Sequence, residues 1–85
     1  MIGLIGARKP YPIFFKTRFG IHTFGVRFPI DVLILDGNNH VVAMKKNLQS
    51  NRVFFWNPIY DSVFELPDKN IQILGISIGE TIKQC

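Results

Sequence analysis

The hydrophobic and polar positions of this chain alternate mostly with the period of a β-strand. The segment IDVLIL at 30–35 is apolar on nearly both faces, which is typical of a buried central strand. The sequence DGNN at 36–39 follows, and Gly and Asn tolerate the positive φ angles of a tight turn. HVVAMK at 40–45 then alternates again. The pattern therefore predicts a β-hairpin over these three segments.

Further strand-like segments lie on both sides of this hairpin. Before it, PIFFK at 12–16 is a short aromatic run, and HTFGVRF at 22–28 alternates as far as Pro29. Proline cannot donate to a sheet ladder, so Pro29 marks a bend, a bulge or an edge. After the hairpin, RVFFWNP at 52–58 and DSVFEL at 61–66 predict two more strands.

Helical spacing appears once, at PDKNIQILG. Asp68 or Asn70 can cap the first amides of this helix, and Gly75 suits a left-handed C-terminal cap. The following residues, ISIGETIKQ at 76–84, predict a glycine turn and a short closing strand. We therefore expect one short helix near residues 68–75.

These elements predict a fold of the mainly β (α+β) class. The chain has 85 residues without an internal repeat, low-complexity tract or linker, so we expect a single domain over residues 1–85. Because so many strands in so short a chain must curl around one core, we favour a small, partly closed, antiparallel β-barrel-like domain over a flat sheet.

Composition supports a folded, cytoplasmic protein. Hydrophobic residues make up 47% of the chain, enough to build a core. No apolar run reaches the roughly 18 residues that span a bilayer, and MIGLIGARKP lacks the features of a signal peptide. The single Cys85 excludes an internal disulfide. The net charge of +4 is spread along the chain and is compatible with a polyanionic partner without requiring one.

Three segments carry a resemblance to a known family. They are IHTFGVRFPIDVLILDGNNHVV at 21–42, SVFELP at 62–67 and LGISIGETI at 74–82. Together they resemble the domain-of-unknown-function family 192 (DUF192), over about residues 3–82. The family name assigns no activity, so the resemblance implies a fold and not a function.

The chain departs from the family pattern at its start. Family members commonly begin with another strand and a helix, whereas here the related GLIG element stands at residues 3–6. The resemblance therefore implies a short form that lacks the usual N-terminal strand. An unpaired sheet edge would follow, open to a second copy of the chain or to a partner strand.

Polar residues gather in the stretch GIHTFGVRFPID at 20–31. His22 and Asp31 could form a general acid–base pair, and Arg27 could bind an anionic oxygen through its planar guanidinium, with Thr23 beside them. The alternative is structural: Asp31 accepts hydrogen bonds from Arg27 or from backbone amides at the bend, and His22 caps that bend.

Aromatic and basic residues are interleaved in FFKTRFG and RVFFWNP. Stacking on aromatic rings, with phosphate pairing by Lys16, Arg18 and Arg52, is how small β domains hold single-stranded nucleic acid. The competing interpretation assigns most of these aromatic residues to the core. Trp56 is the aromatic residue that we most expect at the rim of a pocket.

Our leading hypothesis is a non-catalytic module that binds a small polar or anionic ligand or a protein partner. Its candidate site residues are His22, Thr23, Arg27, Asp31 and Trp56. The alternatives are a small enzyme that uses His22 and Asp31, and a single-stranded nucleic-acid-binding β domain. The histidines lie on different predicted strands and the chain has one cysteine, so we expect neither a metal site nor a cofactor.

Overall fold

The computed structural model describes residues 11–18 and 20–82. In this part of the chain the backbone forms strands and one helix, in the order β1 (Ile13–Lys16), β2 (Ile21–His22), β3 (Ile30–Leu35), β4 (Val41–Leu48), β5 (Val53–Phe54), β6 (Ser62–Pro67) and α1 (Asn70–Leu74). Residues 1–10, which include the GLIG element, lie outside the described residues, as does Cys85.

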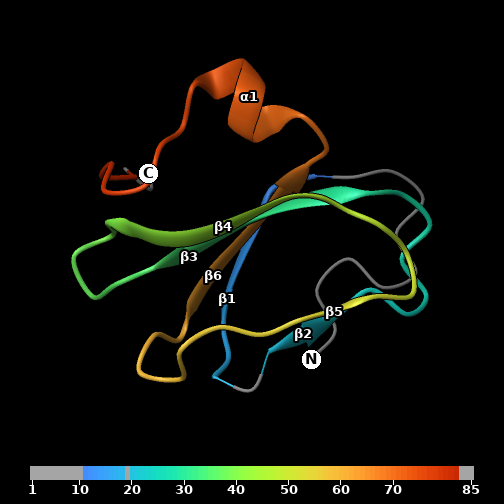
Figure 1. The fold of residues 1–85 in the computed structure, drawn as a ribbon, viewed down its shortest axis with the longest axis horizontal. Helices are drawn as coiled ribbons and strands as arrows, with labels where there is room; N and C mark the ends of the chain where they lie inside the picture. Colours follow the sequence, from blue (N-terminus) through green and yellow to red (C-terminus); the bar gives the residue numbers. More distant parts are fainter. Residues whose placement is uncertain (1–10, 19, 83–85) are drawn as a thin grey trace.

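The strands form two antiparallel sheets. A four-stranded sheet has the order β1-β6-β3-β4, and β2 and β5 form a two-stranded sheet beside it (Figure 1). The mainly β class with one short helix is confirmed. The two sheets do not close into a barrel, because β2 and β5 pair only with each other.

The predicted hairpin is confirmed as β3 and β4. All of β3 is buried, as expected for a strand flanked by β6 and β4. Asp36 closes the turn, because its Oδ1 accepts the backbone N–H groups of Asn38 (2.8 Å) and His40 (2.9 Å). β4 continues beyond the predicted segment to Leu48.

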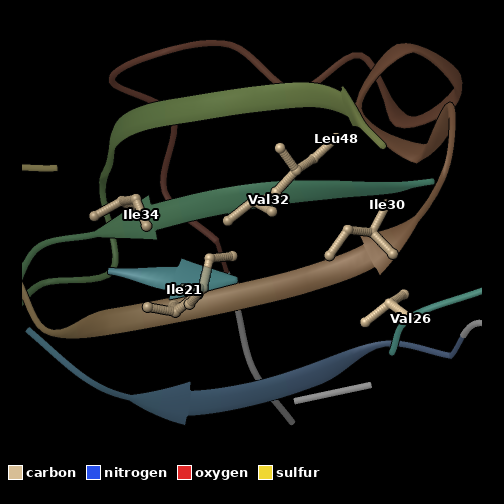
Figure 2. Close-up of a cluster of buried hydrophobic side chains, with 7 residues drawn as sticks. Ile21, Val26, Ile30, Val32, Ile34 and Leu48 are labelled. Atoms are coloured by element: carbon tan, nitrogen blue, oxygen red, sulfur yellow. The ribbon is translucent and has the colours of Figure 1, made fainter. Parts of the chain in front are cut away.

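Each face of the four-stranded sheet carries its own hydrophobic core. The first core lies between this sheet and the β2–β5 sheet, and Figure 2 shows its buried side chains: Ile21, Val26, Ile30, Val32, Ile34 and Leu48, with Val63. The second core lies on the opposite face, toward α1, and consists of Leu33, Leu35, Val41, Leu66 and Ile71. This division follows from the alternation of side chains along β3 and β6.

The strand predicted over 22–28 is wrong beyond His22. Thr23 begins a turn in which its carbonyl accepts the N–H of Val26 (3.1 Å), and Gly25 has a φ of 85°. The bend expected around Pro29 is present, since the backbone bends at Phe28 and β3 begins at Ile30. The strand predicted over 52–58 is limited to Val53–Phe54.

The helix forms near its predicted place, with a different N-terminal cap. Gly75 adopts the left-handed conformation (φ 67°), as the sequence predicts. At the other end, Lys69 occupies the N-cap position, and its own side chain makes no hydrogen bond to the helix. The cap expected from Asp68 or Asn70 is therefore wrong. Along the described residues, no helix has the length and apolar character needed to cross a membrane.

Candidate ligand-binding cavity

An apolar cavity of about 500 Å³ opens on the second face of the four-stranded sheet. The sheet provides its floor, and α1 and the segment after it provide its walls. The lining residues are Pro12, Leu33, Phe64, Leu66, Asn70, Leu74, Ile76, Glu80, Thr81 and Ile82.

The cavity exists because α1 is too short to cover the sheet. Only Ile71 of this five-residue helix is buried, where it completes the second core. Leu74 lines the cavity although its side chain is 61% exposed. The floor beneath it is apolar, since it contains the buried side chains of Leu33 and Leu66. An apolar surface that the chain itself leaves partly uncovered is therefore available to a ligand.

Asp31 holds α1 in place above this floor. Its side chain is 1% exposed, and its Oδ2 accepts the backbone N–H of Ile71 at 2.8 Å. This N–H belongs to the first turn of the helix, where amides lack intrahelical partners. Asp31 therefore supplies the N-terminal cap from a strand 40 residues away in sequence.

The same carboxylate fixes a bulge in β4. Ile30 pairs with Leu48 and Val32 with Lys45, so two residues of β4, Lys46 and Asn47, lie opposite Asp31. Asn47 has a φ of 54°, and its N–H donates to Asp31 Oδ1 at 3.0 Å.

The side chain of Asn47 adds a second link between the bulge and the helix. Its Nδ2 donates to Asp68 Oδ1 at 3.0 Å, just before α1 begins. Asp31 and Asn47 together therefore tie the helix to the sheet.

The wall formed by residues 76–82 is held by the start of β4. Gly79 N–H donates to the carbonyl of Val41 (2.7 Å), and Val41 N–H donates to the carbonyl of Glu80 (2.9 Å). Ile82 N–H donates to the carbonyl of Asn39 (2.8 Å). The predicted closing strand is thus confirmed only as one isolated bridge, between His40 and Thr81.

The cavity suits a mainly apolar molecule with a small polar end. Its volume falls within the roughly 300–1,000 Å³ of typical ligand pockets. Asn70 and Thr81 can exchange hydrogen bonds with a ligand at its walls. Glu80 adds a carboxylate, which accepts the N–H of Ser77 (3.3 Å) and disfavours a ligand with negative charge.

Thr23, one of the residues predicted for the site, closes a loop. Its hydroxyl donates to the carbonyl of Gln49 (2.6 Å) and accepts the N–H of Arg52 (2.8 Å), and its side chain is fully buried. Nearby, Ser50 Oγ donates to the carbonyl of Val26 (2.6 Å). These bonds fasten the β2–β3 connection to the β4–β5 connection.

The structure does not join His22 to Asp31. His22 stacks on Phe24 with ring centroids 5.1 Å apart, and its buried Nδ1 has no hydrogen-bond partner within residues 11–18 and 20–82. Among the described residues no hydrogen bond links this ring to Asp31, whose two oxygens accept backbone amides instead. A buried carboxylate used in this way lacks the solvent access that an acid–base pair requires. Arg27 lies exposed on the β2–β3 connection.

Trp56 lies apart from these residues, packed against the first core. Its indole N–H donates to the carbonyl of Tyr60 at 2.8 Å, and its ring lies 5.7 Å from that of Phe54. None of the predicted site residues lines the apolar cavity. Their role in ligand binding stays a prediction, whereas Asp31 contributes to the cavity by holding its helix.

The cavity residues were not predicted from the sequence. The apolar side of β6 and the LGISIGETI tail are the sequence features that could have indicated them. Neither feature shows that the helix between them is too short to cover the sheet. Within the part of the chain that the structure describes, no three His, Cys, Asp or Glu side chains are grouped to hold a metal ion.

Comparison with known proteins identifies the fold. No protein-family model matches the sequence, and no curated protein matches it. The crystal structure of a "putative transcription regulator" from Sinorhizobium meliloti 1021 is similar, with a TM-score of 0.64 and 15% identity. The match covers 88% of this chain and 55% of that one, so the chain spans about half the length of that structure. At this identity the likeness shows a shared fold alone.

Proposed function

We propose that this protein is a non-catalytic binding module whose apolar cavity takes a small, mainly apolar ligand with a neutral or cationic polar end. The observation that carries the proposal is the cavity itself, about 500 Å³ between an apolar floor and a helix that leaves it open. Burial of the exposed Leu74 side chain by such a ligand would favour binding, since removing apolar surface from water is stabilising.

We also propose that the chain belongs to the DUF192 family. The support is that the three resembling segments supply the framework of the cavity. The first contains Asp31 and the hairpin, the second is β6 in the floor, and the third is the wall at 74–82. The name of the similar crystal structure describes regulation and not a reaction, which agrees with a binding role.

The proposal is tested with N-phenyl-1-naphthylamine, a neutral apolar dye whose fluorescence rises in apolar surroundings. The unmodified protein is expected to bind it, and Leu74→Asp is expected to weaken binding about tenfold or more, because a charge at the cavity wall must be desolvated when the dye enters. Ile73→Asp is the matched control: Ile73 is the neighbouring helix residue, 73% exposed, and does not line the cavity.

Methyl and amide NMR spectra locate the bound dye. Shifts at Leu33, Leu66 and Ile82 are expected, because these residues line the cavity. Absence of binding to the unmodified protein, or equal weakening by the Leu74 and Ile73 variants, would contradict the proposal.

A further inference from the structure

Aromatic side chains are exposed on the outer face of the β2–β5 sheet, away from the first core. Ile21 pairs with Phe54, and both contribute to that core, whereas His22 pairs with Val53 on the opposite face. The alternation continues beyond β5, since Trp56 packs on the core and Phe55 is exposed. Because Phe55 and Val53 on this outer face are exposed, it is a candidate interaction surface.

Two phenylalanines on this side of the molecule present much of their surface to solvent. Phe55 is 67% exposed and Phe24 is 50% exposed. Phe24 is supported from one side by the stacked ring of His22, with an interplanar angle of 27°. Phe55 lies against Gly20, where an added Cβ would be only 2.4 Å from its Cδ1. Each ring therefore has one supported side and a large exposed area.

Basic groups adjoin this aromatic face. A depression of about 220 Å³ includes Val53 in its lining, together with Lys45, Asn47, Leu48, Gln49 and Arg52. Lys45 and Arg52 are exposed, and neither takes part in the ion pairs found among the described residues, which are Arg18–Asp61 and His40–Asp36. No carboxylate of the described residues lines this depression. The positive charge is therefore available to an external anion.

We propose that this aromatic–basic face, formed by His22, Phe24, Lys45, Arg52, Val53 and Phe55, binds single-stranded nucleic acid. Unpaired bases stack on the exposed phenylalanine rings, and Lys45 and Arg52 pair with phosphates. A single strand satisfies both parts of the surface, because it presents flat apolar bases and a regular negative charge together. An apolar protein partner would cover the rings but would leave the two cations desolvated and unpaired.

This surface is distinct from the apolar cavity. The residues that line the cavity are Pro12 and residues of β3, β6, α1 and the tail, and the aromatic–basic face shares none of them. Nucleic-acid binding can therefore fail while dye binding succeeds, and the reverse.

The test is fluorescence anisotropy with labelled twelve-nucleotide oligo(dT) and oligo(U), titrated over a range of salt concentrations. Phe55→Ala and Phe24→Ala are each expected to weaken binding about tenfold, which is the usual effect of losing one stacking ring. Lys45→Ala and Arg52→Ala are each expected to reduce the slope of log K against log salt by about 0.7, because one phosphate contact is lost.

Matched controls separate the site from general effects. Tyr11→Ala removes another exposed aromatic residue, and Lys69→Gln removes another exposed cation, both outside the proposed face. Neither is expected to change affinity by more than about twofold, since neither would contact the strand. The far-ultraviolet circular dichroism and the Trp56 fluorescence verify that every variant remains folded.

Three outcomes would overturn the proposal. The first is undetectable binding to either oligonucleotide at low salt. The second is equal affinity for a duplex of the same length, because paired bases cannot stack on the rings. The third is self-association that Phe55→Ala abolishes while oligonucleotide affinity is unchanged, which would assign the face to a second copy of this chain.

Discussion

Asp31 links three parts of the molecule through one carboxylate. It belongs to β3, its Oδ1 accepts an amide from the bulge of β4, and its Oδ2 accepts an amide from the first turn of α1. A buried carboxylate is stable only when its oxygens are paired, and two backbone N–H groups meet that requirement without a cation. The polar residue inside the apolar run 30–35 is therefore explained by the two backbone amides that it binds.

Replacement of this carboxylate tests the explanation at the residue scale. Asp31→Asn removes the charge and places an NH₂ group against a backbone donor. We expect a loss of about 2–3 kcal/mol in the free energy of unfolding, measured by urea denaturation, because a charge-assisted bond is lost and a buried donor is left unpaired.

The control is Asp61→Asn, at a carboxylate whose ion pair with Arg18 is 3.7 Å long and solvent-exposed. Asp61→Asn is expected to lower the free energy of unfolding by less than about 0.5 kcal/mol. Similar losses in the two variants would show that Asp31 has no special role in holding the helix.

At the scale of the element, the β3–β4 hairpin is specified by its own sequence. The apolar β3 segment, the turn at 36–39 and the returning strand lie in consecutive order, and Asp36 bonds amides only two and four residues away. Asn39 adopts a φ of 63°, the left-handed conformation that its side chain tolerates. Local interactions of this kind can be predicted from sequence alone.

The pKa of Asp36 is expected to show that the hydrogen bonds of the turn at 36–39 are formed. The backbone N–H of His40, donating to this carboxylate, lowers its pKa below the usual 3.8, with further lowering by the N–H of Asn38 and the His40 ring. Because the folded-state pKa is depressed, the stabilisation is present above the unfolded-state pKa and is lost as the pH falls through the folded value. Carbon-detected NMR titration of the Asp36 carboxyl measures this directly.

The Asp36→Asn variant provides the comparison in stability. The difference in unfolding free energy between it and the unmodified protein is expected to narrow as the pH falls below about 3.8. A difference that stays constant through this range would show that the charge on Asp36 does not stabilise the turn.

Other elements depend on groups that are distant in sequence, and there the sequence was a poor guide. The alternation at 22–28 predicts a strand, but the hydroxyl of Thr23 bonds the 49–52 loop and the backbone turns. The C-terminal cap of α1 was predictable because Gly75 is local, whereas its N-terminal cap comes from Asp31. The cavity was not predictable, since it results from the distance between a short helix and a tail bonded to β4.

At the scale of the whole molecule, the two faces of the four-stranded sheet carry hydrophobic cores that are covered to different extents. On the first face, a second sheet covers β3 and β6, and Trp56, Phe54 and Phe28 pack around the buried residues. On the second face, the cover is α1 and the tail, and α1 buries only Ile71. Because resistance to local opening follows the amount of buried apolar surface, the cover of the cavity should open before the rest of the fold.

Native-state hydrogen exchange measures this difference. The amides of Ile73 and Gly75, bonded to the carbonyls of Lys69 and Gln72, are expected to exchange through an opening of lower free energy than the amides of β3. Their opening should depend only weakly on urea, because little surface is exposed when a five-residue helix detaches. The amides of β3 should instead show the free energy and urea dependence of global unfolding, since every residue of this strand is buried.

Bound N-phenyl-1-naphthylamine should slow exchange in α1 and the tail and leave β3 nearly unchanged, apart from the shift in global stability expected for any ligand of the folded state. The control is Ile73→Ala, at a helix residue outside the cavity, which should preserve this protection by the dye. If α1 and β3 instead exchange with one common free energy and one urea dependence, the helix is part of a single cooperative unit. The helix would then detach only when the whole protein unfolds, and a ligand would have to enter the cavity without displacing α1.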